Sequence, residues 1–385
     1  MTTTVVVLGS GYAGTGTVKR LEKELGADTE LVWVSDVDYH FVLHESHRLI
    51  RNPAVDEHVT IPVEEVAARD TRFVQGEVED LDVDDRTVSL AAGEEIDYDY
   101  AVVALGSKTA FYGIPGLAEH SLTLKGRDDA LAIHEAVSEA ASEATREDPA
   151  QIVIGGAGLS GIQSAAEVAK YRDENRAPTD VYLVEALEEI FPGNDDSVQR
   201  ALRKQLEALD IEILTDDPIT EADEDTIHFD EGDPLDHDVF VWTGGITGQD
   251  ALDEAELDKE HNRVHAESTF RTDDDRVFAV GDSALVDQGD DPAPPTAQAA
   301  WQAAEVVGQN VARAIEGRPL KTWRYDDKGT VISVGDKAVA HDVKYAPFVD
   351  TFGSFPAKTL KKVIAARWIK DVAGLGRARR AWPYM

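Results

Sequence analysis

Two glycine-rich hexapeptides with the same spacing are the residues of this chain whose chemistry is easiest to recognise. Gly9-Ser10-Gly11-Tyr12-Ala13-Gly14 and Gly156-Ala157-Gly158-Leu159-Ser160-Gly161 both fit the pattern G-x-G-x-x-G. In such a turn the first glycine makes a tight bend, the second lets the backbone approach a pyrophosphate, and the third allows close helix packing. Each hexapeptide therefore predicts a dinucleotide site, and a glycine-rich turn without a ligand is the alternative for either one alone.

An acidic residue about 20 positions beyond each hexapeptide would bind the ribose hydroxyls of the dinucleotide. After the first hexapeptide an apolar run ends with Ser35 and Asp36, and either residue could occupy that position. After the second, Glu185 ends the run VYLVE and is a cleaner match. A carboxylate there accepts hydrogen bonds from a ribose 2′-hydroxyl and repels a 2′-phosphate. Because residues 186–189 contain no Arg, the second site is predicted to prefer NAD(H) over NADP(H).

The segments around each hexapeptide indicate the elements that position it. Residues 5–36 contain, in this order, an apolar run, the glycine turn, a helical stretch and a second apolar run, ELVWVSD. The same order recurs between residues 151 and 186. Short strands at 72–90 are predicted to form an antiparallel ribbon. Later strands are expected at 100–107, 238–248 and 275–286.

Length and composition restrict the class of protein. A chain of 385 residues is too long for one ordinary domain, so two domains and a smaller appendage are expected. The net charge of −38 is what a halophilic surface would carry, and it speaks against a nucleic-acid partner, which needs a basic face. The chain has no cysteine, which excludes disulfides and thiol redox chemistry.

Five further segments carry a resemblance to a known family. They are YHF (39–41), YAVVALGSKTAFYGIPG (100–116), VWTGGITG (241–248), VFAVGDSA (277–284) and PPTAQAAWQ (294–302). With the two hexapeptides, they make the chain similar to flavoproteins with two dinucleotide-binding domains, and most similar to type II NADH dehydrogenases. The resemblance covers roughly residues 4–345. The missing cysteines separate the chain from disulfide reductases and sulfide:quinone oxidoreductases, which need thiols.

The resemblance implies an α/β fold with two Rossmann-like domains, of which the FAD domain is discontinuous and the NADH domain is inserted into it. The expected boundaries are 1–115 and 246–318 for the FAD domain and 116–245 for the NADH domain. A small C-terminal α+β domain is expected at 319–385, at a membrane surface or a dimer contact.

The resemblance also implies which residues bind each dinucleotide. Asp282 would bind the ribityl chain of FAD and Gly106 would lie near its pyrophosphate, while the prolines before Ala297 would open a helix that points at the flavin. No metal site is expected. The full sets are Gly9, Ser10, Gly11, Ala13, Gly14, Ser35, Asp36, Val78, Gly106, Gly281, Asp282 and Ala297 for FAD, and Gly156, Gly158, Leu159, Ser160, Gly161, Glu185, Gly244 and Gly245 for NADH.

No side chain of the chain is identified with certainty as catalytic. Gln298 and Gln302 are one helical turn apart and in the family lie beside the quinone, although surface glutamines are the alternative. The family commonly has Glu where this chain has Gln163. Because Gln does not titrate, a proton relay at that position is in doubt, and Glu167 is a candidate in its place.

The activity implied by the resemblance is oxidation of NADH by hydride transfer to the N5 atom of FAD, followed by reduction of a membrane quinone of the menaquinone type. The protein would be peripheral, on the cytoplasmic face of the cell membrane. One alternative is a soluble NADH oxidoreductase that uses a protein, oxygen or another small acceptor. A second alternative is a flavin-binding interaction protein with slow turnover. The sequence leaves open whether the chain forms a homodimer.

The chain ends in a basic tail that contrasts with its acidic body. Residues 356–385 contain eight Lys or Arg and one acidic residue, while the whole chain has 37 basic and 75 acidic residues. Leu360, Ile364, Trp368 and Val372 recur every four residues and would line one side of a helix. No run is long enough to span a bilayer. The tail is therefore expected to insert apolar side chains into a membrane surface, or else to pack on the protein itself or on a second subunit.

The segment HFVLHESHR (40–48) is rich in ionisable side chains. His44 and His47 are three positions apart and could bind a metal ion if they lay on one helix. We favour a polar segment that lies along the flavin, because it follows the second strand of the first unit.

Overall fold

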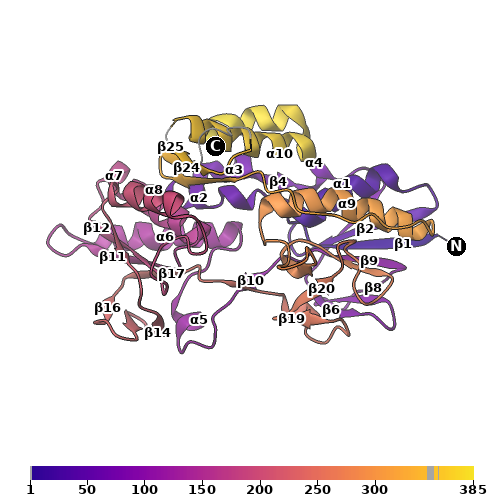
Figure 1. The fold of residues 1–385 in the computed structure, drawn as a ribbon, viewed down its shortest axis with the longest axis horizontal. Coiled ribbons are helices and arrows are strands. Elements are labelled where there is room, and N and C mark those ends of the chain that lie inside the picture. Colours follow the sequence, from indigo (N-terminus) through magenta and orange to yellow (C-terminus); the bar gives the residue numbers. More distant parts are fainter. Residues whose placement is uncertain (1, 345–350, 354) are drawn as a thin grey trace.

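The computed structural model describes residues 2–344, 351–353 and 355–385. Two parallel β-sheets lie side by side along the long axis, and the C-terminal segment lies across the top of both (Figure 1). The predicted fold class is confirmed: two Rossmann-like α/β units and a small α+β segment at the C-terminal end. Part of the predicted C-terminal domain, residues 345–350 and 354, lies outside the described residues.

The first sheet has the strand order β21-β9-β1-β2-β5, and all of its pairs are parallel. Its central strands are apolar runs without polar alternation, because helices and further strands cover both faces of a parallel sheet. The sequence prediction of an antiparallel ribbon is wrong for β5, which pairs in parallel with β2. The bounds are β1 (Thr3–Leu8), β2 (Thr29–Ser35), β5 (Thr71–Gln75), β9 (Tyr100–Val103) and β21 (Val277–Ala279).

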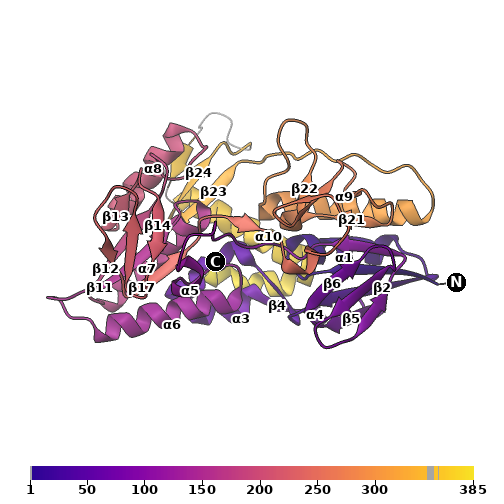
Figure 2. The same ribbon diagram turned by 90° about the horizontal axis from the view of Figure 1, so that it is seen from below.

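Helices α1 (Tyr12–Glu24) and α9 (Ala297–Ile315) pack together on one face of this sheet (Figure 2). Their backbones come close at two glycines: a Cβ on Gly16 would lie 2.6 Å from the Cβ of Ala304, and one on Gly308 would lie 2.7 Å from the Cβ of Arg20. The prolines expected in the first turn of α9 lie before it, and Thr296 caps the helix by accepting a hydrogen bond from the N–H of Ala299 at 3.2 Å. An antiparallel sheet forms from β6 (Val78–Asp82), β7 (Thr87–Leu90) and β8 (Glu95–Asp97).

The second parallel sheet has the order β13-β12-β11-β17 and repeats the strand, glycine turn and helix of the first. Its helices are α6 (Arg127–Glu143), α7 (Leu159–Asn175) and α8 (Asp196–Glu207). The strands are β11 (Ala150–Gly155), β12 (Thr179–Val184), β13 (Ile211–Leu214) and β17 (Val239–Trp242), with an antiparallel sheet of β14 (Ile219–Ala222), β15 (Thr226–Phe229) and β16 (Leu235–Asp236) beside them.

Two extended segments join the two units. The chain enters the second unit through β10 (Lys108–Thr109) and leaves it through β18 (Ile246–Thr247), and these strands pair antiparallel. The indole N–H of Trp242 donates to the carbonyl of Ala110 at 2.9 Å and fixes the crossing. The first unit is completed by β19 (Lys259–Glu260), β20 (Arg263–Ala266), β22 (Ala284–Val286) and the 3-10 helices η3 (Asp250–Leu252) and η4 (Gly281–Ser283). Helix α5 (Leu117–His120) contacts β14 and belongs to the second unit.

The histidine-rich segment forms short elements between β2 and β5. These are β3 (Tyr39–Phe41), η1 (Leu43–Glu45), α2 (His47–Arg51), η2 (Pro53–Val55), α3 (Asp56–Val59), β4 (Thr60–Pro62) and α4 (Val63–Val66). His40, Glu45, His47 and Arg48 are all buried. The segment is therefore an interior layer between the two sheets and the C-terminal segment.

The C-terminal segment consists of a three-stranded antiparallel sheet and a long helix. The strands contact α7 and α8 of the second unit, whereas the helix contacts α1, α3 and α4 of the first. Gly374 has a φ of +86°, which breaks the helix into two arms. The bounds are β23 (Thr330–Val334), β24 (Lys337–His341), β25 (Thr351–Gly353), α10 (Phe355–Ala381) and η5 (Trp382–Tyr384).

The apolar stripe predicted for the tail does not face outward as a unit. Trp368 and Val372 are buried in the body of the protein, and Leu360 packs on the small core of the C-terminal sheet. Only Ile364 of the four is exposed. The stripe fails as a membrane-facing surface because a helix on a folded body turns its largest apolar residue toward the core. The exposed apolar side chains of the tail are instead Val363, Ile364, Leu375, Trp382 and Tyr384.

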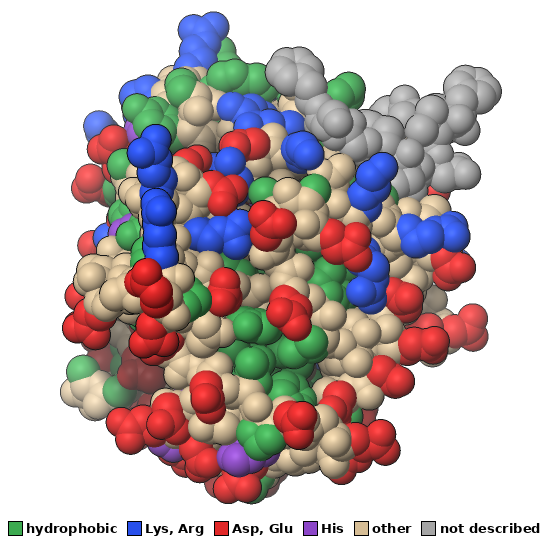
Figure 3. Space-filling model, turned by 90° about the vertical axis from the view of Figure 1, so that its left-hand side faces the viewer, with side chains coloured by type: hydrophobic (Ala, Val, Ile, Leu, Met, Phe, Trp, Pro, Cys, Tyr) green, Lys and Arg blue, Asp and Glu red, His purple; other side chains and the backbone are tan. Residues whose placement is uncertain are grey.

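Charged side chains are unevenly distributed over the surface. On the face at the left-hand end of Figure 1, Lys and Arg gather at the top, over the C-terminal segment, while Asp and Glu are spread below them (Figure 3). Within the described residues, no helix combines the length and apolar character that crossing a membrane requires.

Candidate functional site

The first glycine turn lies at the carboxyl end of β1, and its three glycines have different surroundings. A Cβ on Gly9, whose φ is +107°, would lie 2.2 Å from the carbonyl oxygen of Ala104, and one on Gly14 would lie 2.0 Å from that of Gly9. No atom lies within 4 Å of the place where Gly11 would carry a Cβ. Gly11 is also the N-cap of α1, and no side chain caps the helix there. The turn therefore fits a pyrophosphate that approaches Gly11 and binds the free N–H groups.

Ser35 and Asp36 lie at the end of β2 beside this turn. The hydroxyl of Ser35 is buried and donates to the Ser10 hydroxyl at 2.9 Å. The Asp36 carboxylate is exposed and accepts a hydrogen bond from the N–H of Val37 at 3.1 Å. Of the two residues, only Asp36 offers an acceptor that a ribose could reach from solvent. Its binding to FAD stays a prediction.

The predicted residues from distant parts of the chain meet the first turn. Gly281, with a φ of +74°, is so close to α1 that a Cβ on it would lie 2.8 Å from that of Ala13. Asp282 follows it and accepts a hydrogen bond from the Ser107 hydroxyl at 3.2 Å, next to Gly106. Val78, in contrast, is buried in the core at the start of β6.

Asp282 is surrounded by positive charge. The ammonium of Lys125 donates to Ser107 at 2.9 Å, and the guanidinium of Arg263 donates to the backbone carbonyl of Asp282 at 2.8 Å. Burial lowers the pKa of both Lys125 and Arg263, and the Asp282 carboxylate opposes that shift in each. These two cations are functional candidates that the sequence did not reveal.

The second glycine turn repeats the geometry of the first. A Cβ on Gly161 would lie 1.8 Å from the carbonyl oxygen of Gly156, whereas nothing lies within 4 Å of a Cβ on Gly158. Gly158 is the N-cap of α7, again without a capping side chain. A Cβ on Gly156 would lie 2.8 Å from the Cα of Gly244, so that the predicted Gly244 and Gly245 lie beside this turn. The NADH-binding set is thus brought together at one edge of the second sheet.

Glu185 closes the second turn from the end of β12. Its carboxylate accepts hydrogen bonds from the N–H of Ala157 at 2.8 Å and of Leu187 at 3.1 Å. The side chain is therefore oriented toward the glycine turn, with acceptor capacity left for a ribose hydroxyl. Residues 186–189 are exposed and include Glu188 and Glu189, which would repel a 2′-phosphate.

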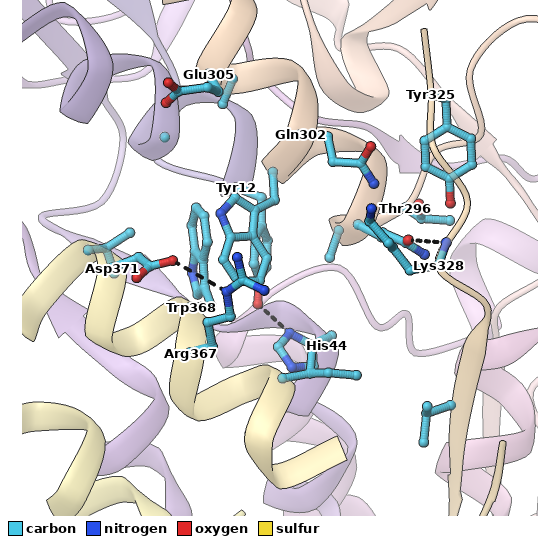
Figure 4. A pocket seen from close by; sticks show the side chains of 18 of the residues that line it. Tyr12, His44, Thr296, Gln302, Glu305, Tyr325, Lys328, Arg367, Trp368 and Asp371 are labelled. Carbon is cyan, nitrogen blue, oxygen red and sulfur yellow. Dashed lines mark hydrogen bonds and ion pairs between the residues drawn. The ribbon is translucent and has the colours of Figure 1, made fainter. Parts of the chain in front are cut away.

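A cavity of about 840 Å³ lies between α1, α9 and α10 (Figure 4). Tyr12, Trp301 and Trp368 provide aromatic walls, and the Arg367 guanidinium lies 5.4 Å from the centroid of the Trp301 ring. Thr296 and Ala297, at the N-terminus of α9, line the same cavity. The cavity therefore joins the first residue of α9 to the C-terminal helix.

Gln298 and Gln302 line this cavity from one face of α9, but their amides are already engaged. Gln302 donates to the carbonyl of Asp326 at 2.9 Å and accepts from its N–H at 3.1 Å. Gln298 accepts from the N–H of Lys328 at 2.7 Å and donates to the carbonyl of Gly329 at 3.3 Å. Both side chains hold the segment before β23 against α9. Gln298 also donates to the Asp327 carboxylate at 3.5 Å, so both of its amide donors are engaged, whereas Gln302 has one amide N–H left for a ligand. A role beside the quinone stays a prediction for both residues.

Buried ionisable groups lie behind the cavity wall. The hydroxyl of Tyr12 is hydrogen-bonded to Nδ1 of His44, and burial lowers the pKa of His44 to about 4. Although burial opposes it, the charges of Arg48, Lys361 and His44 lower the pKa of Glu45 to about 2. Burial also lowers the pKa of Lys361 to about 8, within reach of physiological pH.

Glu167, the predicted relay candidate, belongs to this buried group. It is fully buried on α7, and its carboxylate lies 2.9 Å from the Nε atom of Arg51. Burial raises its pKa, and Arg51 opposes the shift. Among the described residues, no three His, Asp or Glu side chains are arranged to hold a metal ion, His44 and His47 included.

Sequence reasoning missed most of the cavity wall. The hexapeptide pattern leaves the role of Tyr12 unspecified, and the sequence does not decide whether Lys361, Arg367 and Trp368 of the tail face a membrane, the protein itself or a second subunit. Their common signal, the placement of α10 against α1, is a long-range contact that no local pattern reveals. The aromatic and basic composition of the tail was the only hint.

Comparisons with known proteins agree with this geometry. The family model described as pyridine nucleotide-disulphide oxidoreductase matches residues 3–304. The chain is 30% identical over 395 residues to the type II NADH:quinone oxidoreductase of Staphylococcus saprophyticus, covering 97% of each protein. It is 29% identical over 396 residues to the enzyme of the same name from Staphylococcus aureus strain NCTC 8325, again covering 97% of each.

Solved structures share the fold at lower sequence identity. NDH2 from Plasmodium falciparum in complex with NADH superposes with a TM-score of 0.84 at 14% identity, covering 100% of this chain and 98% of that one. The sulfide:quinone oxidoreductase of Aquifex aeolicus superposes with a TM-score of 0.80 at 19% identity, covering 96% of this chain and 91% of that one. Because this chain has no cysteine, the shared fold does not carry disulfide or sulfide chemistry with it.

Proposed function

Because the chain belongs to the type II NADH:quinone oxidoreductases, within the pyridine nucleotide-disulphide oxidoreductase family, we propose that it oxidises NADH with bound FAD and reduces a quinone. FAD supplies, when bound, an acceptor for the hydride of NADH and a donor for the quinone. One observation carries the assignment of sites: each glycine turn presents its second glycine to open space, while an aromatic cavity adjoins the first turn through Tyr12.

The side chains around the first turn would bind and orient FAD. Gly11 would approach the pyrophosphate, and Asp282, held by Ser107, would accept hydrogen bonds from the ribityl hydroxyls. The N–H groups of α9 at Ala297 would stabilise negative charge on the flavin. The domain boundaries 1–115, 116–245, 246–318 and 319–385 are part of this proposal, and the pairing of β10 with β18 supports a crossing between the first two domains near the ends of the inserted segment.

A steady-state assay tests the acceptor. NADH oxidation by the purified protein should be slow without added quinone and should accelerate at least about tenfold with menadione. A rate that depends on oxygen alone would instead support the soluble oxidase alternative. Binding of NADH without turnover under any acceptor would support the interaction-protein alternative.

The quinone would bind in the cavity between α9 and α10. Planar aromatic walls of Tyr12, Trp301 and Trp368 favour a flat, fused-ring headgroup such as that of a menaquinone, because stacked rings gain area and dispersion energy. Gln302 would offer its remaining amide donor to a quinone oxygen, and Gln298 would do so by giving up its long bond to Asp327. The preference is tested by measuring kcat/KM for menadione and for a single-ring benzoquinone with the same substituents. The value for menadione should be the higher of the two.

The outer surface of the tail supports peripheral attachment to a membrane. Val363, Ile364, Leu375, Trp382 and Tyr384 are exposed, and residues 356–385 also contain eight Lys or Arg. Apolar and Trp side chains with a basic surround suit the interfacial region of a bilayer. Because NADH is a cytoplasmic substrate, the attachment would be on the inner face.

A variant that leaves the buried side of the tail intact tests attachment. Leu375→Asp combined with Val363→Asp places two charges on the outer surface, so co-sedimentation with anionic lipid vesicles should fall at least about tenfold. The measurement is made at low and at molar salt, since the screening length shrinks to about 3 Å at 1 M. Unchanged sedimentation would contradict attachment, and a change from dimer to monomer in light scattering would assign the surface to a homodimer.

A further inference from the structure

The carbonyl groups of the first glycine turn are held from the side opposite to its open face. The indole N–H of Trp33 donates to the carbonyl of Gly9 at 2.9 Å. The carbonyl of Ser10 accepts from the Thr15 hydroxyl at 2.9 Å and from Nδ1 of His40 at 2.8 Å. These bonds fix the peptide planes of the turn and so direct its N–H groups. Any residue that controls His40 therefore acts on the geometry of the turn.

The partners of His40 determine its protonation. A carbonyl oxygen only accepts, so Nδ1 carries the proton and donates to Ser10. The other ring nitrogen, Nε2, accepts a hydrogen bond at 2.8 Å from the indole N–H of Trp368, which can only donate. His40 is fully buried and Trp368 nearly so. The two hydrogen bonds from Trp368 to His40 and from His40 to Ser10 therefore run in one direction. Both can form only while the imidazole is neutral.

Trp368 reaches this position from the C-terminal helix. Its ring centroid lies 4.6 Å from that of Tyr12 and 4.9 Å from that of Trp301, and Figure 4 shows it beside Tyr12. The indole also lies next to α1, since a Cβ on Gly16 would lie in van der Waals contact with its Cη2 atom, at 3.6 Å. The tail thus contributes one side chain to the support of the turn, 328 residues away from His40 in the sequence.

The second glycine turn has no such support from the tail. The hydroxyl of Thr243, which follows β17 in the same unit, lies 2.9 Å from the carbonyl oxygen of Gly155 and 2.9 Å from that of Gly156. The two turns are alike in glycine spacing but differ in what holds them. A change in the tail should therefore reach one dinucleotide site and not the other.

We propose that Trp368 is a positioning residue for the FAD site, which holds the first glycine turn in its binding geometry through His40. The inference rests on the proposed function, because it takes FAD as the occupant of the first turn. The C-terminal segment is then part of the cofactor site as well as a surface element. Loss of the Trp368 N–H leaves Nε2 of His40 buried without a donor, and the imidazole can then turn away from Ser10.

Low pH should disrupt the hydrogen bond between Trp368 and His40. Burial lowers the pKa of His40 to about 4, which keeps the ring neutral at pH 7. Protonation would place an N–H of His40 against the N–H of Trp368. Two titratable groups face His40, Tyr12 of α1 and His44 of η1. Burial raises the pKa of Tyr12 and lowers the pKa of His44, so both side chains are neutral at pH 7. From α10, Lys361 contributes to the shift of His44.

Trp368→Phe tests the proposal, because it keeps an aromatic ring and removes the donor. Trp382→Phe is the matched control in the same tail, since Trp382 is exposed and far from the first turn in its contacts. The FAD dissociation constant of the apoproteins should rise about tenfold for Trp368→Phe and stay unchanged for Trp382→Phe. The KM for NADH, measured with saturating FAD, should be the same in all three proteins.

The pH profile separates positioning from general damage. Release of FAD on acidification, followed by flavin fluorescence, should depend less on the protonation of His40 in Trp368→Phe than in the wild type, because the variant has no indole N–H for the protonated ring to meet. In a His40→Leu background, where no acceptor is present, Trp368→Phe should have no further effect on FAD affinity.

Each outcome decides a separate point. Equal FAD affinity and equal pH profile in wild type and Trp368→Phe would overturn the inference while leaving the proposed function intact. Additive losses in the double variant would also overturn it, because Trp368 would then act by a route other than His40. A wild-type protein that binds no FAD would refute the proposed function itself.

Discussion

At the scale of single residues, Gly11 and Gly14 have opposite surroundings although they belong to one turn. A methyl group on Gly11 would enter open space, whereas one on Gly14 would lie 2.0 Å from a backbone oxygen. The sequence pattern assigns the second glycine to the ligand and the third to helix packing. The surroundings of the two glycines in the structure agree with that assignment.

Gly11→Ala and Gly14→Ala should therefore fail in different ways. We expect Gly11→Ala to change the free energy of unfolding by less than about 1 kcal/mol and to weaken FAD binding at least about tenfold. Gly14→Ala should lose more than about 2 kcal/mol of stability, because the backbone must move. Urea unfolding of the apoproteins and FAD titration measure both quantities. Equal losses of stability would contradict the assignment of the open face.

Glu185 sets the preference between NADH and NADPH. In Glu185→Gln the amide oxygen can still accept from the N–H of Ala157, but the negative charge that repels a 2′-phosphate is lost. The ratio of kcat/KM for NADH over NADPH should fall about tenfold. Glu188→Gln, at a neighbouring exposed position, is the control and should leave most of the ratio in place. An unchanged ratio in Glu185→Gln would refute the role.

At the scale of elements, the buried histidines of the segment from β3 to α2 make the free energy of unfolding depend on pH. The pKa of His40 is lowered to about 4 in the folded protein, below its ordinary value of about 6.5. The unfolded chain therefore binds a proton that the folded chain does not, and stability is lost as the pH falls from 6.5 toward 4. The loss is of the order of 3 kcal/mol at pH 4 for His40. His44, whose pKa is also lowered to about 4, adds less because a fifth of its side chain is exposed.

Urea unfolding at pH 7 and at pH 4.5 measures this dependence. The urea midpoint should be lower at pH 4.5 than at pH 7. From pH 7 to pH 8 it should rise slightly, because Lys361, whose pKa burial lowers to about 8, begins to lose its proton in the folded chain but not in the unfolded chain. A midpoint that is flat down to pH 4.5 would show that these histidines are accessible to protons in the folded state.

The elements around each glycine turn were predictable because strand, turn and helix are encoded by adjacent residues. The ends of β1, β2, β11 and β12 follow from apolar runs that stop at Gly or at a polar residue. The buried side of the tail helix could not be predicted in this way. Trp368 and Ile364 are one turn apart on α10, yet one is buried and the other exposed. Which side of an amphipathic helix packs inward depends on the surface that receives it, and here that surface is α1, more than 300 residues away in the chain.

The amides of α9 show a similar limit at the site. The sequence correctly placed Gln298 and Gln302 on one helix face, and their hydrogen bonds to the backbone of residues 326–329 could not be predicted. That segment has no regular secondary structure, so no periodic pattern marks it.

At the scale of the whole molecule, Arg51 joins three parts of the protein. From α2 of the first unit it pairs with the buried Glu167 of α7 at 2.9 Å and with Asp336, between β23 and β24, at 3.2 Å. Arg51→Met should cost about 3 kcal/mol of stability, because the buried Glu167 would lose its ion-pair partner and keep only the more distant charges of Arg48 and Lys361. Adding Glu167→Gln should restore part of the loss.

Glu174→Gln is the matched control for this prediction. Glu174 also pairs with Arg51, at 3.4 Å, but its side chain is half exposed, so the change should cost less than about 1 kcal/mol. Thermal or urea unfolding of the wild type and these three variants measures the differences. A loss in Arg51→Met no larger than that in Glu174→Gln would contradict the view that this ion pair holds the units together.

The central claim is that one chain binds FAD at the first turn and NADH at the second, and passes electrons to a quinone. An anaerobic titration followed by the visible absorbance of the flavin tests it most directly. We predict that one equivalent of NADH per bound FAD bleaches the flavin band, and that one equivalent of menadione restores it. A band that NADH does not bleach, or that menadione does not restore, would contradict the account.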